Sequence, residues 1–339
     1  MKVTDTTSST ILSHKGSMVN LSVADIQRVI AEKITKGLVV PEHTDTAHFY
    51  RHTGEGGGLY ASVTTKTSAM NSGEYLKMWA ANMAVEQLAD ALSKYPEIFA
   101  DANRMTLAKK SAVMAHQNYF EDAGTTGTAG HNVVEDYLND WIATGVKPES
   151  IKSFIKPSEQ DSRVFASARS AELFCNEWDV QPIASELLVA SKKYKYAGTL
   201  DSLMLVTLPI GKTKSPCKLH MYLGTKSGKL VCDVCSQKAE RVFCIVDWKT
   251  SNSINKEQYA MQVIAYRQAF FEMTGLKPKK MYIVRLDKAQ AKYEMLEVVY
   301  SVKTLKAFLA ISVVYDWKNN KEKKLLSINK RDQVSLNDL

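Results

Sequence analysis

The spacing of apolar residues divides the chain into a helical first half and a mixed second half. Up to residue 178, apolar side chains recur every three or four positions, as in Val23, Ile26, Val29 and Ile30, which is typical of amphipathic helices. This spacing predicts helices over residues 21–38, 72–94, 103–120, 130–143 and 161–178. The later pattern predicts strands over residues 182–190, 195–208, 241–250, 280–285 and 293–299, and helices over 255–274 and 302–318.

The order of these elements indicates the fold class. Helices come first, and strands then alternate with helices, as in domains built on a central sheet. The helix over residues 255–274 is expected to connect the strand before it to the strand that begins at residue 280, as a crossover. We therefore predict an α/β (α+β) fold with a central mixed sheet flanked by helices.

The composition of the connecting segments predicts the domain limits. Residues 1–20 are rich in Ser and Thr and are expected to be disordered, and residues 321–339 are expected to form a polar tail. Residues 21–60 are expected to hold a helix and a loop. Residues 61–320 then form one domain, in which residues 72–143 are expected to build a helical wall.

The overall composition is that of a soluble globular protein. The chain has 339 residues, of which 45% are hydrophobic and 24% charged, enough to bury a core. It has no run of about 18 apolar residues and no signal-peptide pattern, so no membrane association is expected. Five cysteines do not make a disulfide scaffold in a chain of this length, and we expect an intracellular, cytoplasmic protein. The net charge of +8 is compatible with a polyanionic partner, and also with charge that only serves solubility.

Two carboxylates and a lysine stand at the ends of predicted strands. Asp247 and Lys249 end an apolar run, and Asp201 ends another. Because side chains alternate along a strand, Asp247 and Lys249 point to the same face, where Asp201 on a paired strand can join them. Carboxylates bind Mg²⁺ or Mn²⁺, and an ammonium can position or deprotonate a metal-bound water. This combination suits hydrolysis of phosphodiesters, whereas an isolated Asp-x-Lys triplet is more commonly a solvated part of a strand.

At these residues the chain resembles the PD-(D/E)XK nuclease superfamily, and within it the RecB-like exonucleases, which include mitochondrial and phage members. That group has an acid on one strand, an acid-x-lysine on the next and then a Gln-x-x-x-Tyr helix, matched here by Asp201, Asp247, Lys249, Gln262 and Tyr266. Leu200 stands where many members of the superfamily have a proline before the first acid, but RecB-like members often lack that proline.

Two further segments carry the resemblance. The family has a histidine in a small-residue stretch that enters a helix, and His131 in Gly127-Thr128-Ala129-Gly130-His131 matches it. The family also opens with a Ser-Val-Thr block and a helix that carries a tryptophan, matched by Ser62-Val63-Thr64 and Trp79. The resemblance covers residues 60–282.

The resemblance implies a role for each matched residue. Asp201, Asp247 and His131 would hold Mg²⁺ or Mn²⁺, and a histidine ligand would favour Mn²⁺. Lys249 would activate water or stabilise the charge of the transition state. Glu186 looks like the family's extra acid, which either holds a second metal or is only a surface charge.

The glutamine and the tyrosine of the helix motif have two readings. Gln262 and Tyr266 are four residues apart and therefore share a helix face. From that face they would hydrogen-bond a substrate phosphate or orient Lys249. Alternatively, they form a partly buried polar pair at the edge of the core.

A candidate zinc site lies between the two predicted catalytic strands. Cys217 and His220 form a C-x₂-H pair, and Cys232 and Cys235 form a C-x₂-C pair after a further eleven residues. Four such ligands suit a tetrahedral structural Zn²⁺. The connection is much longer than a usual strand turn, so we expect an inserted zinc knuckle over residues 211–240. The alternative is an extended hairpin with reduced thiols.

Together these features predict a metal-dependent DNA nuclease, and more specifically an exonuclease, that acts on single-stranded DNA or duplex ends. Its expected cofactors are Mg²⁺ or Mn²⁺, with structural Zn²⁺ in the knuckle, and no small-molecule cofactor is expected. Trp79, Tyr119 and Trp248 are candidates for stacking on a single strand, although core packing is the more common role of such residues. Two alternatives stay open: a non-catalytic nucleic-acid-binding protein with a relic nuclease core, and a restriction-type endonuclease.

Overall fold

The computed structural model describes residues 9–12, 18–44, 47–70, 74–210, 222–224, 230–233 and 235–319. The strands are β1 (Ser9–Leu12), β2 (Met18–Leu21), β3 (Val39–Pro41), β4 (Phe49–His52), β5 (Gly58–Ser62), β6 (Gln181–Ser191), β7 (Tyr196–Pro209), β8 (Tyr222–Gly224), β9 (Leu230–Cys232), β10 (Lys238–Lys249), β11 (Lys280–Leu286) and β12 (Tyr293–Glu297). The α-helices are α1 (Val23–Lys33), α2 (Val63–Thr67), α3 (Glu74–Lys94), α4 (Ala102–Thr144), α5 (Ser162–Glu177), α6 (Lys256–Thr274) and α7 (Val302–Asn319). Short 3₁₀ helices are η1 (Ser68–Met70), η2 (Pro96–Ala100), η3 (Ile151–Phe154) and η4 (Pro157–Glu159).

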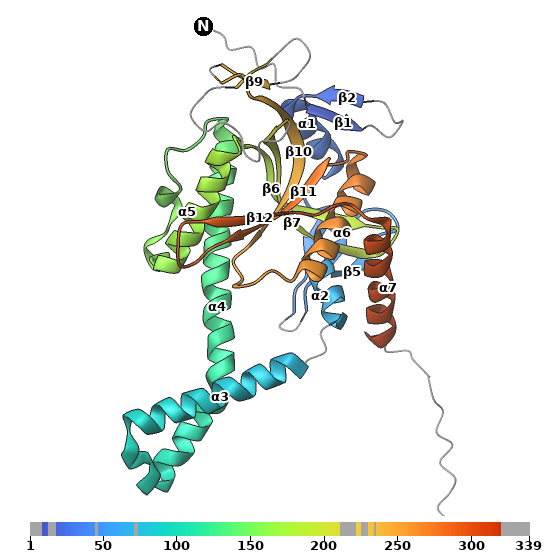
Figure 1. Cartoon of the computed structure of the whole chain (residues 1–339). Coiled ribbons are helices and arrows are strands. Elements are labelled where there is room, and N and C mark those ends of the chain that lie inside the picture. The colour runs from blue at the N-terminus through green and yellow to red at the C-terminus, as the bar shows by residue number, and fades with distance from the viewer. Residues whose placement is uncertain are drawn as a thin grey trace, which may run out of the picture.

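One mixed sheet forms the centre of the molecule, with helices on both of its faces (Figure 1). The strand order is β12-β11-β10-β7-β5-β4-β3, and β6 also pairs with β7. The β10–β11 and β5–β7 pairs are parallel, whereas β10–β7 and β6–β7 are antiparallel. The predicted α/β class with a central mixed sheet is therefore confirmed.

Alternation along β10 explains how the two faces are covered. Phe243 and Ile245 lie in a core shared with α1, α6 and α7. Val242, Cys244 and Val246 lie in a second core shared with α4 and α5. A strand buried on both faces needs a continuous apolar run, which is the pattern seen in the sequence of β10.

The helix that joins β10 to the parallel strand β11 has clear end signals. The Asn255 side chain accepts a hydrogen bond from the backbone N–H of Gln258 at 3.2 Å, which caps the first turn of α6. Gly275 ends α6 with a φ of 75°, a left-handed conformation that favours glycine. The predicted helix over residues 255–274 and its role as a connection between two strands are thus confirmed.

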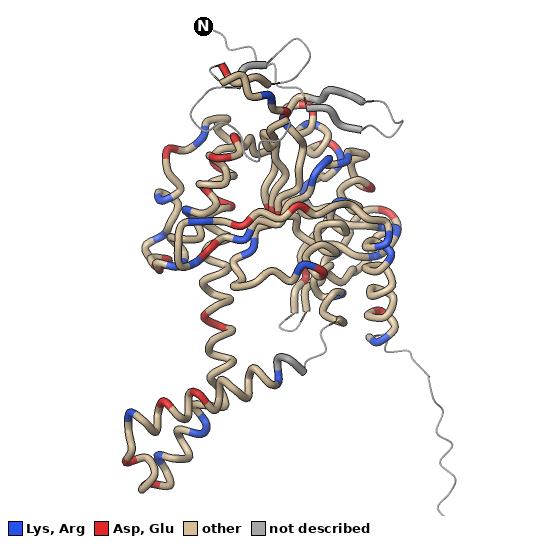
Figure 2. Tube along the Cα trace, in the orientation of Figure 1, with Lys and Arg blue, Asp and Glu red and all other residues tan. Residues whose placement is uncertain are grey.

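Helix α4 departs from the prediction because it is one helix of 43 residues. Two helices were expected, with a break before Gly130. The segment of α4 near its C-terminal end packs on the body, and the rest projects away from the sheet together with α3 as an arm (Figure 1). The contacts of the expected wall over residues 72–143 with the body come from α4, and they begin at Tyr119 with Asn252 and Asp122 with Arg163. Figure 2 shows acidic and basic residues interspersed along the arm.

The N-terminal segment also differs from the prediction. Disorder was expected over residues 1–20, but β1 and β2 form an antiparallel hairpin within the described residues. The segment is rich in Ser and Thr and lacks a long apolar run, which suggested disorder. Strands of four residues, however, need only a short apolar run. The expected tail at residues 321–339 lies outside the described residues. None of the helices in the described part of the chain combines the length and apolar character that a membrane span requires.

Candidate active site

The candidate active site lies at a fork in the sheet. Strand β7 pairs with β10 through residues 202–209 and, further toward its start, with β5 through Tyr196 and Ala197. Because β6 pairs with β7 along residues 196–205, β10 and β5 must share the opposite edge of β7. Between them, residues 198–201 have no strand partner on that edge among the described strands. The sheet thus opens where the predicted acid Asp201 stands.

Asp201 bridges the fork through its side chain. Its Oδ2 accepts a hydrogen bond from the backbone N–H of Trp248 at 2.8 Å. Burial raises the pKa of Asp201, while the Lys249 ammonium and the bond from Trp248 act in the opposite direction. The carboxylate is therefore held in place by β10 in a setting that disfavours its charge.

Asp247 and Lys249 share a strand face, as predicted. The Lys249 Nζ lies 2.6 Å from Asp247 Oδ2, and the two side chains are 15% and 1% exposed. Lys249 is thus the partner of this buried carboxylate, whose oxygens accept no further hydrogen bond from the described residues. The Lys249 ammonium balances the charge of Asp247, and a metal bound here would have to share this carboxylate with it.

The charges around this pair shift its proton affinities in a consistent way. Burial raises the pKa of Asp247 to about 6, with Lys249 lowering it and Asp201 raising it further. Burial alone would lower the pKa of Lys249, but Asp247 and Asp201 more than offset this, so the pKa lies above its ordinary value. Lys249 is therefore an ammonium at neutral pH, which suits a role as a fixed positive charge rather than a base.

His131 reaches the same place from α4. Desolvation, followed by the positive charge of Lys249, lowers the pKa of His131 to about 4, while the charge of Asp247 acts in the opposite direction. The imidazole is thus neutral at physiological pH, with a lone pair available to a metal. Glycines let α4 approach the end of β10 this closely, since a Cβ at Gly127 would stand 2.9 Å from Thr250 Oγ1. The helix continues through these glycines, and their missing side chains serve its contact with the end of β10.

Glu186 faces the fork from β6. On β6 its two neighbours pair with Ser202 and Leu200 of β7, so Glu186 lies opposite Asp201. Its φ of 48° is left-handed, which is strained for a glutamate in a strand and is typical of functional sites. Burial and the charge of Asp201 raise the pKa of Glu186 to about 8. Glu186 is partly buried beside these carboxylates, which favours the family's extra acid over a plain surface charge.

Sequence reasoning missed Glu135. This residue lies one turn after His131 on α4, and its charge contributes to the raised pKa of Glu186. Burial raises the pKa of Glu135 itself. The signal was present in the sequence, because residues four apart share a helix face, and a glutamate four positions after a site histidine therefore points the same way.

Gln262 and Tyr266 cover the fork from α6. The Gln262 Nε2 donates to the Tyr266 hydroxyl at 3.2 Å, and both residues are buried. The Tyr266 ring packs on the backbone of Gly198, where an added Cβ would stand 2.6 Å from the ring. Burial raises the pKa of Tyr266, and the charges of Asp201 and Asp247 raise it further, which places the tyrosine beside both carboxylates. The predicted shared helix face is confirmed.

Two more tyrosines line the fork without having been predicted. The Tyr50 hydroxyl lies 3.1 Å from Thr199 Oγ1. Burial raises the pKa of Tyr50, and the charges of Glu186 and Asp201 raise it further. The Lys249 ammonium lies 5.0 Å from the centre of the Tyr259 ring. Trp248, in contrast, is 2% exposed and packs edge-on against Phe174, so core packing is its role rather than stacking on a substrate.

The zinc ligands are only partly within the described residues. Cys217 and His220 lie outside them. Cys232 is buried, Cys235 is exposed, and the Cys235 backbone N–H donates to the Cys232 sulfur at 3.4 Å. The two cysteines therefore sit in one tight turn, as a C-x₂-C pair requires.

The arrangement brings four carboxylates, an imidazole and an ammonium to one opening in the sheet. As the side chains stand, no three His, Cys, Asp or Glu residues of the described segments are close enough to hold one metal ion. Asp247 is turned toward Lys249 and Asp201 toward the Trp248 N–H. Metal binding at the fork would therefore require these carboxylates to rotate.

Comparison with known proteins does not assign a family. No protein-family model and no curated protein sequence matches the chain. Among solved structures, one similar chain is described as "Crystal structure of SSO0001", with 11% sequence identity and a TM-score of 0.24 over 57% of this chain and 75% of that one. A likeness this weak says nothing about function, which must be inferred from the site itself.

Proposed function

We propose that the protein is a divalent-metal-dependent nuclease with a PD-(D/E)XK core, which hydrolyses phosphodiester bonds of DNA at the fork. The observation that carries the proposal is the 2.6 Å pair between Lys249 Nζ and Asp247 Oδ2, next to Asp201. Clustered carboxylates with raised pKa values destabilise a fold, and such clusters are typical of functional sites. Hydrolysis of a phosphodiester needs a metal, a water and a fixed positive charge, and this set of side chains supplies ligands and charge.

The donor set fits Mg²⁺ or Mn²⁺. Carboxylate oxygens are the ligands these ions prefer, and the neutral His131 adds a nitrogen that favours Mn²⁺. The buried Asp247 carboxylate is paired with the Lys249 ammonium, and the further carboxylates at the fork leave negative charge that a metal ion would balance. Asp201, Asp247 and His131 would hold the ion, with Glu186 and Glu135 on the facing side. When bound, the ion would supply Lewis acid charge and lower the pKa of a water molecule.

The chain's own residues do the rest of the work. The Lys249 ammonium stands where negative charge develops on the phosphate and stabilises it. The absence of a Cβ at Gly198 leaves room for the Tyr266 ring, whose hydroxyl then reaches the fork with Gln262. These two polar groups would bind a phosphate oxygen and hold the DNA strand in register. Release of a 5′- or 3′-phosphate end completes the hydrolysis.

Zinc forms a separate part of the proposal. Cys232 and Cys235 already share one turn, and Cys217 with His220 would complete a tetrahedral set. The β8–β9 hairpin pairs with the start of β10, so this insertion is attached to the catalytic strand. Its zinc would stabilise the insertion and would take no part in hydrolysis.

A cleavage assay on defined DNA ends tests the proposed function. Single-stranded and duplex DNA, end-labelled when linear and internally labelled when circular, is incubated with Mg²⁺, with Mn²⁺ and with EDTA. We expect metal-dependent loss of label from linear DNA and none from circles. Cleavage of closed circles would indicate an endonuclease, and undiminished cleavage in excess EDTA would exclude the metal mechanism. The Lys303→Ala variant, which changes an exposed lysine on α7, is the control for Lys249→Ala.

A further inference from the structure

A cavity of about 540 Å³ opens beside the end of β10, away from the carboxylates of the fork. Its walls come from four segments: α4, the start of α5, the loop after β10, and the turn between β11 and β12. Thr250, which directly follows Lys249, is one of its lining residues. The cavity and the fork are therefore neighbours along the chain, because Lys249 lies at the fork and the next residue lines the cavity. This volume falls in the range of small-ligand sites.

The distance from the fork to the cavity follows from α4. Ala123 lines the cavity, and His131 faces the fork eight residues later on the same helix. At 1.5 Å of rise per residue, the two positions are about 12 Å apart along the helix axis. A polymer chain bound at the fork would therefore enter the cavity within a few of its units.

The charge balance of the cavity favours an anion. Three cations (Arg163, Arg285 and Lys288) and two carboxylates (Asp122 and Asp287) line it. Both carboxylates are already engaged, Asp122 with the Arg163 guanidinium and Asp287 with the backbone N–H groups of its own turn.

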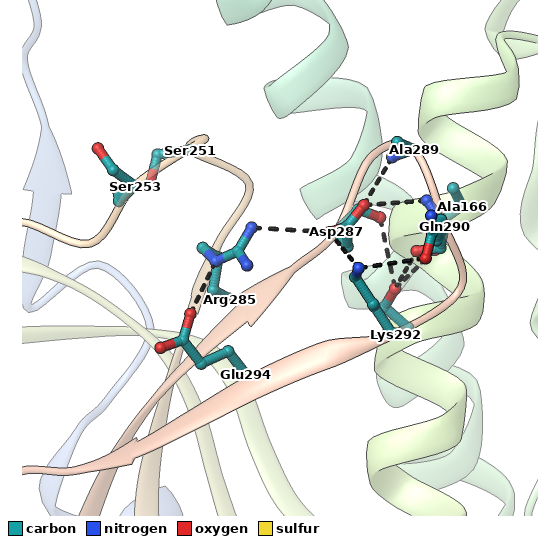
Figure 3. Close-up of polar contacts among 10 residues, drawn as sticks. Ala166, Ser251, Ser253, Arg285, Asp287, Ala289, Gln290, Lys292 and Glu294 are labelled. Carbon is teal, nitrogen blue, oxygen red and sulfur yellow. Dashed lines mark hydrogen bonds and ion pairs between the residues drawn. The ribbon is translucent and has the colours of Figure 1, made fainter.

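Lys288 holds the positive charge that is left, because Arg163 and Arg285 are both paired with carboxylates. Arg163 is engaged by Asp161 as well as by Asp122. Arg285 uses its Nε on Glu294 at 3.1 Å, and its Nη1 lies 3.9 Å from Asp287 (Figure 3). Lys288 makes no ion pair within the described segments. Desolvation and the charge of Arg163 lower its pKa, while the charges of Asp122 and Asp161 act in the opposite direction without cancelling the shift. A bound anion would relieve this unfavourable setting.

An aromatic ring, that of Tyr119, also lines the cavity. Tyr119 is 41% exposed, and its hydroxyl accepts a hydrogen bond from Asn252 Nδ2 at 3.0 Å. On the arm side its ring packs edge-on against Trp79, with the ring centres 5.5 Å apart. The ring is thus fixed in orientation by two contacts while part of it stays open. A fixed, partly exposed ring and a cation that line the same cavity suit a nucleotide, since its base can stack on the ring and its phosphate can contact the cation.

We propose that this cavity binds one nucleotide of a single strand that continues from the fork, with its phosphate at Lys288 and Arg285 and its base on the Tyr119 ring. This inference rests on the proposed function, because the same DNA strand is taken to be bound at the fork as well. The cavity then sets the path of the strand from β10 toward the arm. Trp79, which packs edge-on against Tyr119, lies next along that path.

Binding of fluorescent oligothymidylates of 4, 8 and 12 nucleotides in EDTA tests the proposal without cleavage. We expect Tyr119→Leu to weaken binding of the longest oligomer by about 10-fold, the scale of one lost stacking contact. Lys288→Gln should weaken it and reduce the slope of log affinity against log salt by about 0.7 to 1, as expected for one lost phosphate contact. Tyr119→Leu should leave that slope unchanged.

Matched controls are Lys303→Gln on α7 and Tyr95→Leu at the far end of the arm, which also change an exposed lysine and an exposed tyrosine. Thermal melting checks that every variant is folded. Equal affinity of the two cavity variants and the wild type would overturn the proposal. So would thymidine 5′-monophosphate that competes as well as the 12-mer, because the ligand would then be a free nucleotide.

Failure of this inference and failure of the proposed function give different results. A protein that cleaves DNA but binds it equally well with Lys288→Gln contradicts the cavity assignment alone. A protein that never cleaves DNA, yet loses binding and salt dependence with Lys288→Gln, contradicts the nuclease assignment alone and supports the cavity as a strand-binding site.

Discussion

The backbone N–H of Trp248 donates a 2.8 Å hydrogen bond to Asp201 Oδ2, just beyond the last ladder pair of β7 and β10, Ser202 with Val246. A carboxylate thus continues the pairing of the two strands where backbone pairing stops. Asp201 therefore combines a structural contact with its proposed role as a metal ligand. Substitutions at this position can separate the two.

We expect Asp201→Asn and Asp201→Ala to differ in stability but not in activity. The amide oxygen of asparagine can still accept from Trp248, whereas alanine leaves this N–H without its partner, at a cost of about 1–3 kcal/mol. Both variants lose a charged ligand and should lose cleavage by roughly 100-fold or more, the scale of a lost electrostatic contact in the transition state. Urea unfolding and single-turnover cleavage measure the two effects. Retention of cleavage by Asp201→Asn would remove this residue from the metal site.

Glu186 makes the stability of the metal-free protein depend on pH. Its pKa of about 8 in the folded state lies above the ordinary value, so the folded state binds the proton more tightly than the unfolded state. This contribution is fully present below about pH 4.5, the ordinary range of a glutamate, and is lost as the pH rises toward 8.

As the pH rises from about 5 to 8 in EDTA, the melting temperature of the wild type should therefore decrease more than that of Glu186→Gln. Glu32→Gln, at an exposed position on α1, serves as the control and should run parallel to the wild type. Added Mn²⁺ should raise the melting temperature of the wild type at pH 8 more than that of Glu186→Gln. A constant difference between wild type and Glu186→Gln across this range would show that the glutamate is not buried against other carboxylates.

The zinc proposal is tested by elemental analysis of protein purified without chelators. We expect about one zinc per chain, as for closed structural sites with four protein ligands. Cys232→Ser should lower the zinc content and destabilise the insertion while leaving cleavage by the folded fraction largely intact. Cys175→Ser, a buried cysteine on α5 outside the insertion, is the control for losing a thiol. Zinc-free protein with an unchanged melting curve would contradict the assignment.

Much of the site was predictable because its residues follow local rules. Alternation along β10 placed Asp247 and Lys249 on one face, and the four-residue spacing of α6 placed Gln262 and Tyr266 together. The strands and the crossover helix followed from periodicity and from the end signals at Asn255 and Gly275.

The missed features depend on contacts between segments that are distant in the sequence. Gly127 and Gly130 suggested a break in the helix, because glycine lowers helix propensity. Their lack of a Cβ instead lets α4 pack against Thr250 and Ser167, and the helix continues. The fork itself, the cavity beside it and the place of Glu135 depend on how β10 and β5 share one edge of β7, which no local pattern encodes.

Lys249→Ala should lower the cleavage rate by roughly 10²–10⁴-fold, the scale of a positioned charged or proton-transfer group. Binding of DNA should change little, because one phosphate contact is a small part of the total electrostatic attraction. The variant also leaves Asp247 and Asp201 without their nearby cation, so the metal-free protein should be less stable. Asp247→Ala should instead weaken metal binding, and excess Mn²⁺ should partly restore its activity. Near-wild-type cleavage by a folded Lys249→Ala would show that β10 is not the catalytic strand.

The contact of Gly198 with Tyr266 gives the most direct test of the fork geometry. A Cβ at residue 198 would stand 2.6 Å from the buried ring, too close for either group to stay in place. Gly198→Ala should therefore destabilise the protein by about 1–3 kcal/mol, the usual cost of overpacking, and lower its activity by displacing the tyrosine hydroxyl. Gly124→Ala is the control, since a Cβ there meets nothing within 4 Å and alanine favours the helix by about 1 kcal/mol. In the double variant Gly198→Ala, Tyr266→Ala the clash is gone. Its loss of stability should therefore be smaller than the sum of the losses of the two single variants, while its activity stays low. Additive effects on stability would mean that the two residues do not touch, and that the fork is shaped differently.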